Sequence, residues 1–153
     1  MVGIGADSVR LERLGPGDEP RLQSVCGLFK ERVPSVEEAA RFLARDDIHV
    51  WVAEVDGEPA GFAYAYVLLR VDGDRSVFLY ELAVDERRRR RGIGRALVEA
   101  ARSAAEREGV LKMWVDTSYD NEPARRTYES AGGTAVDEPT LVYGWRFRRL
   151  REP

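Results

Sequence analysis

The sequence predicts a mixed α/β domain with a central, mostly antiparallel sheet. Three strand-like segments, rich in β-branched and aromatic residues and separated only by short Asp-Gly turns, predict an antiparallel meander. They span residues 48–55, 59–70 and 76–84. Apolar residues at helical spacing follow from Gly92 to Glu108, and a further strand is expected at 110–117. This strand–helix–strand order is typical of a parallel crossover, so the sheet is expected to be mixed.

The N-terminal part is expected to contribute one strand and two helices. Residues 8–14 alternate well enough for a first strand, which a turn rich in glycine and proline follows. Helices are expected at 21–33 and 35–46. Ser35 suits the cap of the second helix, because Glu38 three residues later completes a capping box.

The C-terminal part is expected to contribute a helix and a strand. The helix, 121–133, has Asn121 or Asp120 as its capping residue and Gly132 as its stop signal. Residues 140–150 predict the last strand. About four helices are therefore expected to flank the sheet.

Composition indicates one globular domain, 1–153. Of its 153 residues, 44% are hydrophobic and 33% charged, an ordinary balance for a soluble protein. No apolar run approaches the ~20 residues that a membrane helix needs, and the first ten residues lack the features of a signal peptide. The single cysteine, Cys26, cannot form an internal disulfide, so a cytoplasmic location without membrane association is expected.

Much of the positive charge lies in two arginine clusters. They are Arg87–Arg91 and the tail residues Arg146, Arg148, Arg149 and Arg151; without these nine charges the net charge of −3 becomes −12. A cationic patch on an anionic body suits a phosphate compound bound at the patch and a cation bound elsewhere. Nucleic acid is not expected as a partner, because domains that bind it are usually basic overall.

Gly92 and Gly94 open the helix that follows the arginine run. Backbone N–H groups at a helix N-terminus bind phosphate through their free donors and the helix dipole, and glycines leave these donors unhindered. One or two of the preceding arginines are expected to contact the same anion. The alternatives are a tight turn and close packing for the glycines, and a solvated loop or a nucleic-acid patch for the arginines.

Glu81 stands inside an apolar strand. By strand alternation it shares a face with Val77, Leu79 and Ala83, so it is expected among apolar side chains. Such surroundings disfavour the charged carboxylate and raise its pKa, which suits a general base near neutral pH. The alternatives are a buried ion pair and a surface charge on an edge strand.

Three other residues are expected to be structural when taken alone. Cys26 lies among apolar residues at helical spacing, His49 is the only histidine and lies in a strand, and Tyr128 occupies a helix where tyrosine usually fills the core. No His, Cys and Asp cluster has metal-ligand spacing, so no metal is predicted. The pattern of a Ser-His-Asp triad is also lacking.

Two motifs stand on neighbouring elements of this predicted fold. Arg89-Arg90-Arg91-Gly92-Ile93-Gly94 follows a central strand and fits [QR]-x-x-G-x-[GA]; Asn121, Ala124, Tyr128 and Gly132 fit Asn-x-x-Ala-x-x-x-Tyr-x-x-x-Gly. Together they resemble the hallmarks of the GNAT superfamily of acetyl-CoA-dependent N-acetyltransferases. The resemblance implies the GNAT fold, in which strands 4 and 5 splay apart, and acetyl-CoA as the cofactor.

The same resemblance implies site residues for direct acetyl transfer. Glu81 is implied as the general base and Tyr128 as the general acid. Backbone groups of Leu82, Ala83 and Val84 are implied to hold the cofactor arm, together with Asn121. The amides around the pyrophosphate are implied to be those of Arg89, Arg90, Arg91, Gly92, Ile93, Gly94 and Arg95.

The segments 80–97 and 118–132 carry a closer resemblance, to the aminoglycoside 3-N-acetyltransferases of that superfamily. It implies an acceptor that is a primary amine of a cationic small molecule. Substrate contacts are then expected at Glu81, Asp116, Tyr119, Asp120 and Glu122. A polyamine, an amino acid or a protein amine as acceptor, and a non-catalytic acyl-CoA-binding module, are the alternatives. A homodimer is expected from family habit alone.

Overall fold

The computed structural model describes residues 9–136 and 140–147. Within these residues five strands form one sheet in the order β1-β2-β3-β4-β5. They are β1 Val9–Leu14, β2 Ile48–Val55, β3 Glu58–Leu69, β4 Arg75–Val84 and β5 Met113–Trp114. Strands β1 to β4 pair antiparallel, and β5 pairs parallel with β4. The predicted meander and crossover are therefore confirmed.

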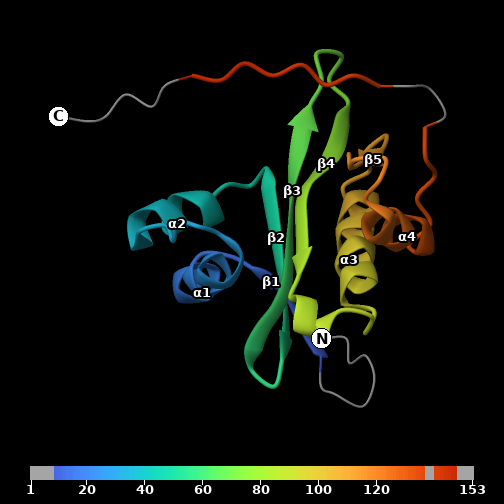
Figure 1. Ribbon diagram of the computed structural model, residues 1–153. Coiled ribbons are helices and arrows are strands. Elements are labelled where there is room, and N and C mark those ends of the chain that lie inside the picture. Colours follow the sequence, from blue (N-terminus) through green and yellow to red (C-terminus); the bar gives the residue numbers. More distant parts are fainter. Residues whose placement is uncertain (1–8, 137–139, 148–153) are drawn as a thin grey trace.

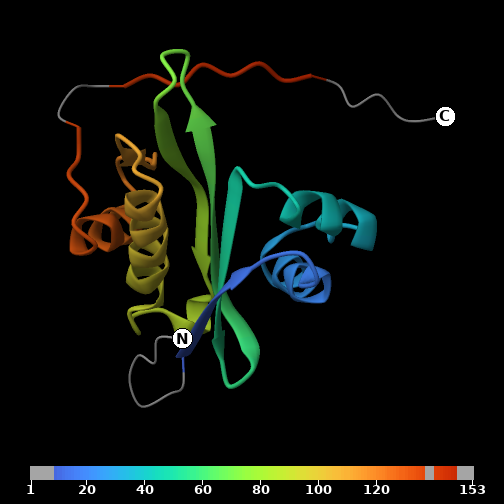
Figure 2. The same cartoon turned by 180° about the vertical axis from the view of Figure 1, so that it is seen from behind.

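The helices of the described residues cover both faces of the sheet (Figures 1 and 2). They are α1 Glu19–Phe29, α2 Val36–Leu43, α3 Ile93–Arg107 and α4 Glu122–Ser130, with a short 3-10 turn, η1, at Glu86–Arg88. Helices α1 and α2 lie on one face, where Val25 is buried, and α3 and α4 on the other, where Leu97 is buried. None of the helices described is long and apolar enough to cross a membrane.

The capping residues are those that the sequence predicts. The Ser35 hydroxyl accepts a hydrogen bond from the Glu38 amide at 3.1 Å, and the Glu38 carboxylate accepts one from the Ser35 amide at 2.8 Å. The Asn121 side-chain oxygen accepts a bond from the Ala124 amide at 3.2 Å. Gly132 follows α4 with a φ of 90°, a conformation that favours glycine.

Helix α1 lies earlier in the chain than predicted. It spans Glu19–Phe29 rather than 21–33, and it starts inside the predicted turn because Pro20 fits a first helical turn, where its missing N–H has no partner in any case. It ends before Lys30, whose backbone is extended with φ −123° and ψ 153°. The prediction of a helix to residue 33 is therefore wrong.

Strand β5 is much shorter than the predicted segment 110–117. It pairs with β4 at only two positions, where Val77 is opposite Met113 and Phe78 is opposite Trp114. Beyond this contact β4 continues to Val84 without β5. The short pairing agrees with the expected splay of the two strands.

The predicted last strand, 140–150, is wrong for residues 140–147, and residues 148–150 lie outside the described residues. Residues 140–147 form no strand and run along the top of both views, away from β5 (Figures 1 and 2). A strand needs a neighbouring edge to satisfy its backbone groups, and the sequence pattern alone does not supply one. The side chains of Tyr143 and Trp145 remain exposed.

Candidate active site

A β-bulge at Tyr80 decides which way Glu81 faces. Along the β3–β4 ladder Ala65 is opposite Leu79 and Tyr64 is opposite Glu81, so Tyr80 is the extra residue on β4. One extra residue reverses the facing of the side chains beyond it. Glu81 therefore faces α1 and α2, as Tyr80 does, and not α3 as Leu79 does.

The packing of neighbouring side chains agrees with this reversal. Before the bulge, Val77 and Leu79 belong to the core under α3. Beyond it, Leu82 packs against that same core and Ala83 against the core under α1 and α2. The prediction that Glu81 shares a face with Val77 and Leu79 is wrong, because side-chain alternation does not reveal a bulge.

Glu81 forms an ion pair with Lys30, the residue that follows α1. The side chains are partly exposed, 26% for Glu81 and 40% for Lys30. Burial, followed by the negative charge of Glu81, raises the pKa of Tyr64. Of the alternatives open from the sequence, an ion pair is present, although it is not fully buried. Sequence reasoning missed Lys30, whose only signal is that it is one of two lysines.

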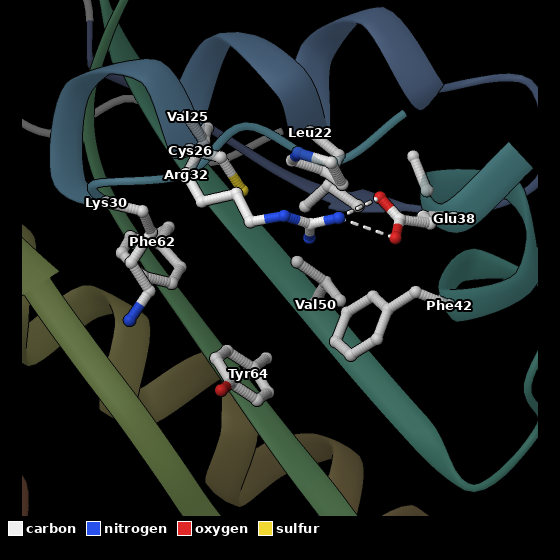
Figure 3. Close-up of a pocket in the computed structure, with 12 residues that line it drawn as sticks. Leu22, Val25, Cys26, Lys30, Arg32, Glu38, Phe42, Val50, Phe62 and Tyr64 are labelled. Atoms are coloured by element: carbon white, nitrogen blue, oxygen red, sulfur yellow. Dashed lines mark hydrogen bonds and ion pairs between the residues drawn. The ribbon is translucent and has the colours of Figure 1, made fainter. Parts of the chain in front are cut away.

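A pocket of about 270 Å³ adjoins this ion pair, between α1, α2 and the sheet (Figure 3). Its walls are mainly apolar, with Val25, Phe42 and Phe62 among them. Lys30 also lines the pocket. The Arg32–Glu38 ion pair, at 2.6 Å, is also part of the lining. The pocket therefore offers mainly apolar contacts, with one ion pair in its wall and the Lys30–Glu81 pair beside it.

Cys26 lines the same pocket and is only half-buried. Burial raises the pKa of its thiol, the positive charge of Lys30 opposes this shift, and the negative charge of Glu81 adds to it. The packing role predicted for Cys26 is therefore incomplete, since part of its side chain is open to the pocket.

A row of aromatic side chains extends from Glu81 across β3, β4 and β5. Successive ring contacts join Tyr64, Tyr66, Tyr80, Phe78 and Trp114, and the last two rings are stacked with centroids 4.0 Å apart. Aromatic faces attract ammonium groups, so the row and Glu81 together suit a cation. Sequence reasoning missed this row, although tyrosines or phenylalanines two residues apart within a strand were a signal.

Beyond its short contact with β5, the outer edge of β4 has no strand beside it within the described residues. The Asp85 amide donates a hydrogen bond to the Ala60 carbonyl at 2.8 Å, so it faces β3. Because backbone groups alternate along a strand, those of Leu82 and Val84 face the outer edge and those of Ala83 face β3. The contacts predicted between these three residues and a cofactor arm stay a prediction.

Glycine suits positions 92 and 94, at the start of α3, for two different structural reasons. Gly92 is the N-cap and has a φ of 77°, which favours glycine. A Cβ at Gly94 would lie 3.1 Å from Cγ2 of Thr127 in α4. The structural alternative thus applies to both glycines. The first-turn amides, including those of Ile93 and Arg95, lack partners within the helix and suit an anion, but phosphate binding stays a prediction.

The arginine run is partly engaged with nearby carboxylates. Within the run, Arg87 forms an ion pair with Asp85 at 2.9 Å, and Arg89 lies 3.8 Å from Glu86. Beyond the run, Arg95 of α3 forms an ion pair with Glu99 at 2.7 Å. Arg90 has a φ of 63°, an uncommon conformation for a residue with a side chain, and it marks the tight turn into α3. The contacts predicted for Arg89, Arg90 and Arg91 with a pyrophosphate stay a prediction.

Tyr128 lies on α4 and packs, partly buried, against the core under α3. Burial, and after it the charge of Asp116, raises the pKa of its hydroxyl, so the phenol keeps its proton at neutral pH. The packing role is confirmed, and the role as an acid stays a prediction. Because Asn121 uses its side-chain oxygen to cap α4, its predicted cofactor contact is left to its other polar groups.

Three predicted substrate contacts lie in a second pocket at the start of α4. It has a volume of about 390 Å³ and is lined by Tyr119, Asp120 and Glu122, among others. Glu122 is ion-paired with Arg126, which offsets its charge. Within the described residues, the two pocket linings share no member. Glu81 is not among the residues that line the second pocket, so these three side chains line it without Glu81.

His49 is structural, as predicted. It is buried, with Nδ1 in contact with Arg13 of β1 and Nε2 in contact with Glu108 at the end of α3. Across 9–136 and 140–147, no group of three or more His, Cys, Asp or Glu side chains is arranged to hold a metal ion.

Known proteins resemble this chain in sequence and in fold. Residues 21–133 match the family described as the acetyltransferase (GNAT) family. Over 77 residues the chain is 36% identical to the ribosomal protein bS18-alanine N-acetyltransferase of Escherichia coli K12, a match that covers 50% of this chain and 49% of that protein. The chain spans about half the length of the curated relatives it matches.

Two solved structures, both of aminoglycoside acetyltransferases from uncultured soil metagenomic samples, have a similar fold. One has a TM-score of 0.83 at 24% identity and covers 92% of this chain and 97% of its own. The other has a TM-score of 0.77 at 26% identity and covers 92% and 99%. These likenesses confirm the predicted fold class.

Proposed function

The chain belongs to the acetyltransferase (GNAT) family, whose members are acetyl-CoA-dependent N-acetyltransferases, and from that premise we propose that it acetylates a primary amine of a cationic small molecule. An aminoglycoside is the first candidate, with its 3-N position as the proposed site. The observation that carries this proposal is the contact between Glu81 and the primary ammonium of Lys30. A carboxylate that binds one primary ammonium is suited to bind another in its place.

The proposed chemistry begins with deprotonation of the acceptor. An alkyl ammonium with a reference pKa near 10 has no lone pair at neutral pH, so it must lose a proton before it can attack. Glu81 accepts this proton, directly or through water. The outward N–H groups of Leu82 and Val84 are suited to hold the cofactor arm and to polarise the thioester carbonyl.

The remaining steps are proposed for residues on the α3–α4 side. Acetyl-CoA supplies the acetyl group as a thioester. The amides that open α3, after Gly92, bind its pyrophosphate, and nearby arginines such as Arg89 add positive charge. Tyr128, whose raised pKa keeps its phenol protonated, donates a proton to the departing thiolate. The products are an N-acetyl amine and the free thiol.

The dimensions of the site bear on the acceptor. Pockets for drug-sized ligands are usually about 300–1,000 Å³, whereas the pocket beside Lys30 is about 270 Å³. It is therefore suited to one ring or one aliphatic arm, while the rest of the acceptor lies over the aromatic row. The pair Tyr80 and Trp114, both exposed, offers that surface.

A protein amine is the second candidate. The similarity to an enzyme named for the alanine of a ribosomal protein favours it, and an extended chain end fits an open aromatic surface as well as a sugar ring does. The non-catalytic alternative, an acyl-CoA sensor, needs no base or acid. The presence of Glu81 and Tyr128 therefore weighs against it.

Release of free thiol from acetyl-CoA, measured against a panel of acceptors, tests the proposal. The panel contains aminoglycosides, polyamines, amino acids and peptides with N-terminal alanine. Fast turnover with aminoglycosides, with the product mapped to the 3-amine, is the expected result. Turnover with peptides alone would replace the acceptor but keep the chemistry. Binding of acetyl-CoA without turnover of any amine of the panel would favour the sensor.

A further inference from the structure

We propose that Lys30 is acetylated at Nζ by the active site of its own chain. This proposal rests on the proposed function, because it uses the same base and the same acetyl donor. The structure supplies the juxtaposition: the primary amine of Lys30 contacts the side chain proposed to deprotonate the acceptor, Glu81. Lys30 is thus a tethered acceptor held at the position that an external amine has to reach.

The local backbone brings Lys30 to this position. Helix α1 ends at Phe29, and the extended conformation of Lys30 directs its chain out of the helix toward β4. On the other side of the contact, in β4, the bulge at Tyr80 turns Glu81 to the face of the sheet that α1 covers. Both side chains are partly exposed, so an acetyl donor at the outer edge of β4 has access to them from solvent.

The reaction balances without any further reagent. The Lys30 ammonium gives one proton to Glu81, and the nitrogen lone pair then attacks the acetyl carbonyl. A new C–N bond forms as the C–S bond breaks, and the thiolate takes a proton from Tyr128. The nitrogen then loses its second proton, which restores the Tyr128 phenol through solvent, and Glu81 releases the first proton to solvent. The net change is one thioester consumed, one acetyl-lysine and one free thiol formed, and one proton released to solvent.

The chain contains its own control, since Lys112 is the only other lysine. It is exposed and precedes β5, where its carbonyl accepts a hydrogen bond from the Val77 amide at 2.9 Å. Uncatalysed acetylation by a thioester depends on exposure and amine basicity, so it labels both lysines. Acetylation by the active site labels Lys30 alone.

Cys26 is the competing nucleophile, because it lines the same pocket as Lys30. Its thiol remains largely protonated near neutral pH, since burial raises its pKa, and a protonated thiol is a weak nucleophile. An S-acetyl group is cleaved by neutral hydroxylamine, whereas an N-acetyl group is stable. Treatment of the product with hydroxylamine therefore separates the two sites.

Acetylation of Lys30 has a consequence for the site. It removes the positive charge, so the ion pair with Glu81 is lost and the carboxylate is released to an external amine. Before the modification, Lys30 competes with the external amine for the Glu81 carboxylate. After the modification it no longer does. Each chain undergoes it once, so it appears as a burst of one thiol per chain before steady turnover.

The test is incubation of the purified full chain with acetyl-CoA, followed by intact mass measurement and peptide mapping over time. The expected result is one acetyl group on Lys30, added at a rate independent of protein concentration. Acetylation of Lys112 is expected to be much slower. Glu81→Gln and Tyr128→Phe each slow labelling of Lys30, the former by about 10²-fold or more, as loss of a general base does. Labelling of Lys112 is unchanged in both variants.

Three results overturn the proposal. Equal labelling of both lysines, unaffected by Glu81→Gln, shows an uncatalysed reaction. A hydroxylamine-sensitive product on Cys26 assigns the acetyl group to the thiol. Turnover of external amines in the same sample with Lys30 unmodified rejects self-acetylation while the proposed function stands. Because Glu81→Gln and Tyr128→Phe act on different elements, misfolding of one variant leaves the other to decide.

Discussion

The ammonium of Lys30, just after α1, is paired with the carboxylate of Glu81 beyond the bulge of β4. An ammonium in this position does two things to an incoming cation. It occupies the carboxylate, and it repels a second positive charge. Lys30 is therefore expected to weaken acceptor binding for as long as its charge remains.

Lys30→Met removes the charge and keeps an unbranched side chain of similar length. The KM for a cationic amine is expected to fall by up to about five-fold, because a partly exposed ion pair contributes at most about 1 kcal/mol. The kcat is expected to change little, since Glu81 remains. Initial rates of N-acetyl-amine formation, taken before Lys30 of the wild type is acetylated, measure both constants. Lys112→Met is the matched control and is expected to leave the KM unchanged; a KM that rises in Lys30→Met would show that Lys30 helps to hold the acceptor.

Glu81→Gln keeps the shape of the side chain and removes its charge. The kcat is expected to fall by about 10²–10⁴-fold at neutral pH, the usual contribution of a general base. The loss is expected to shrink at high pH, because more of the acceptor amine is then already deprotonated. The pH–rate profile of the variant measures this. Since the substitution also breaks the pair with Lys30, the comparison is repeated in a Lys30→Met background, and a loss that is equal at every pH would assign Glu81 to binding.

Tyr128→Phe tests the proposed acid. Because burial and then Asp116 raise the pKa of Tyr128, its proton is retained beyond the ordinary tyrosine value of about 10. The wild-type rate is therefore expected to show no loss from this group up to about pH 10, and the variant is expected to be slower at every pH below it. Calorimetry with CoA is the control and should give similar affinities. Weaker cofactor binding with an unchanged rate of transfer would remove Tyr128 from the chemistry.

The sequence predicted the features that depend on neighbouring residues. The Ser35–Glu38 capping box, the Asn121 cap and the crossover around α3 follow from side chains a few positions apart, so local chemistry is enough to find them. The start of α1 was missed because Pro20 suits both a turn and the first turn of a helix.

The features that depend on distant parts of the chain were not predictable in the same way. The facing of Glu81 depends on one extra residue, Tyr80, and a bulge leaves no mark in an alternating pattern. The partner of Glu81 lies 51 positions away, at Lys30, and no spacing rule reaches that far. The residues from 140 to 147 alternate as a strand does, but the structure gives them no edge to join.

Gly94 and Thr127 are expected to be energetically coupled. A Cβ at position 94 would lie 3.1 Å from Cγ2 of Thr127, so Gly94→Ala introduces a close contact that destabilises the fold. The same substitution stabilises the helix by about 1 kcal/mol through the higher helix propensity of alanine, and the two effects oppose each other. Thr127→Ser removes that methyl group and keeps the hydroxyl, which donates to the Pro123 carbonyl at 2.9 Å. Gly94→Ala is therefore expected to be more favourable by about 1 kcal/mol in the Thr127→Ser background. Urea unfolding of the four proteins measures the coupling, and additive effects would show that α3 and α4 relax apart.

The thiol of Cys26 reports the charges of the candidate site. Its pKa is raised mainly by burial, so the reactive thiolate is scarce at neutral pH, and alkylation by iodoacetamide is expected to be slower than for a free cysteine until the pH exceeds the ordinary thiol range. Lys30 lowers this pKa and Glu81 raises it. Alkylation at a fixed, mildly alkaline pH is therefore expected to slow further in Lys30→Met and to quicken in Glu81→Gln. Rates followed by mass spectrometry measure these opposite changes, and Lys112→Met should match the wild type. Changes of the same sign in both site variants would mean that access to the pocket, rather than charge, controls the thiol.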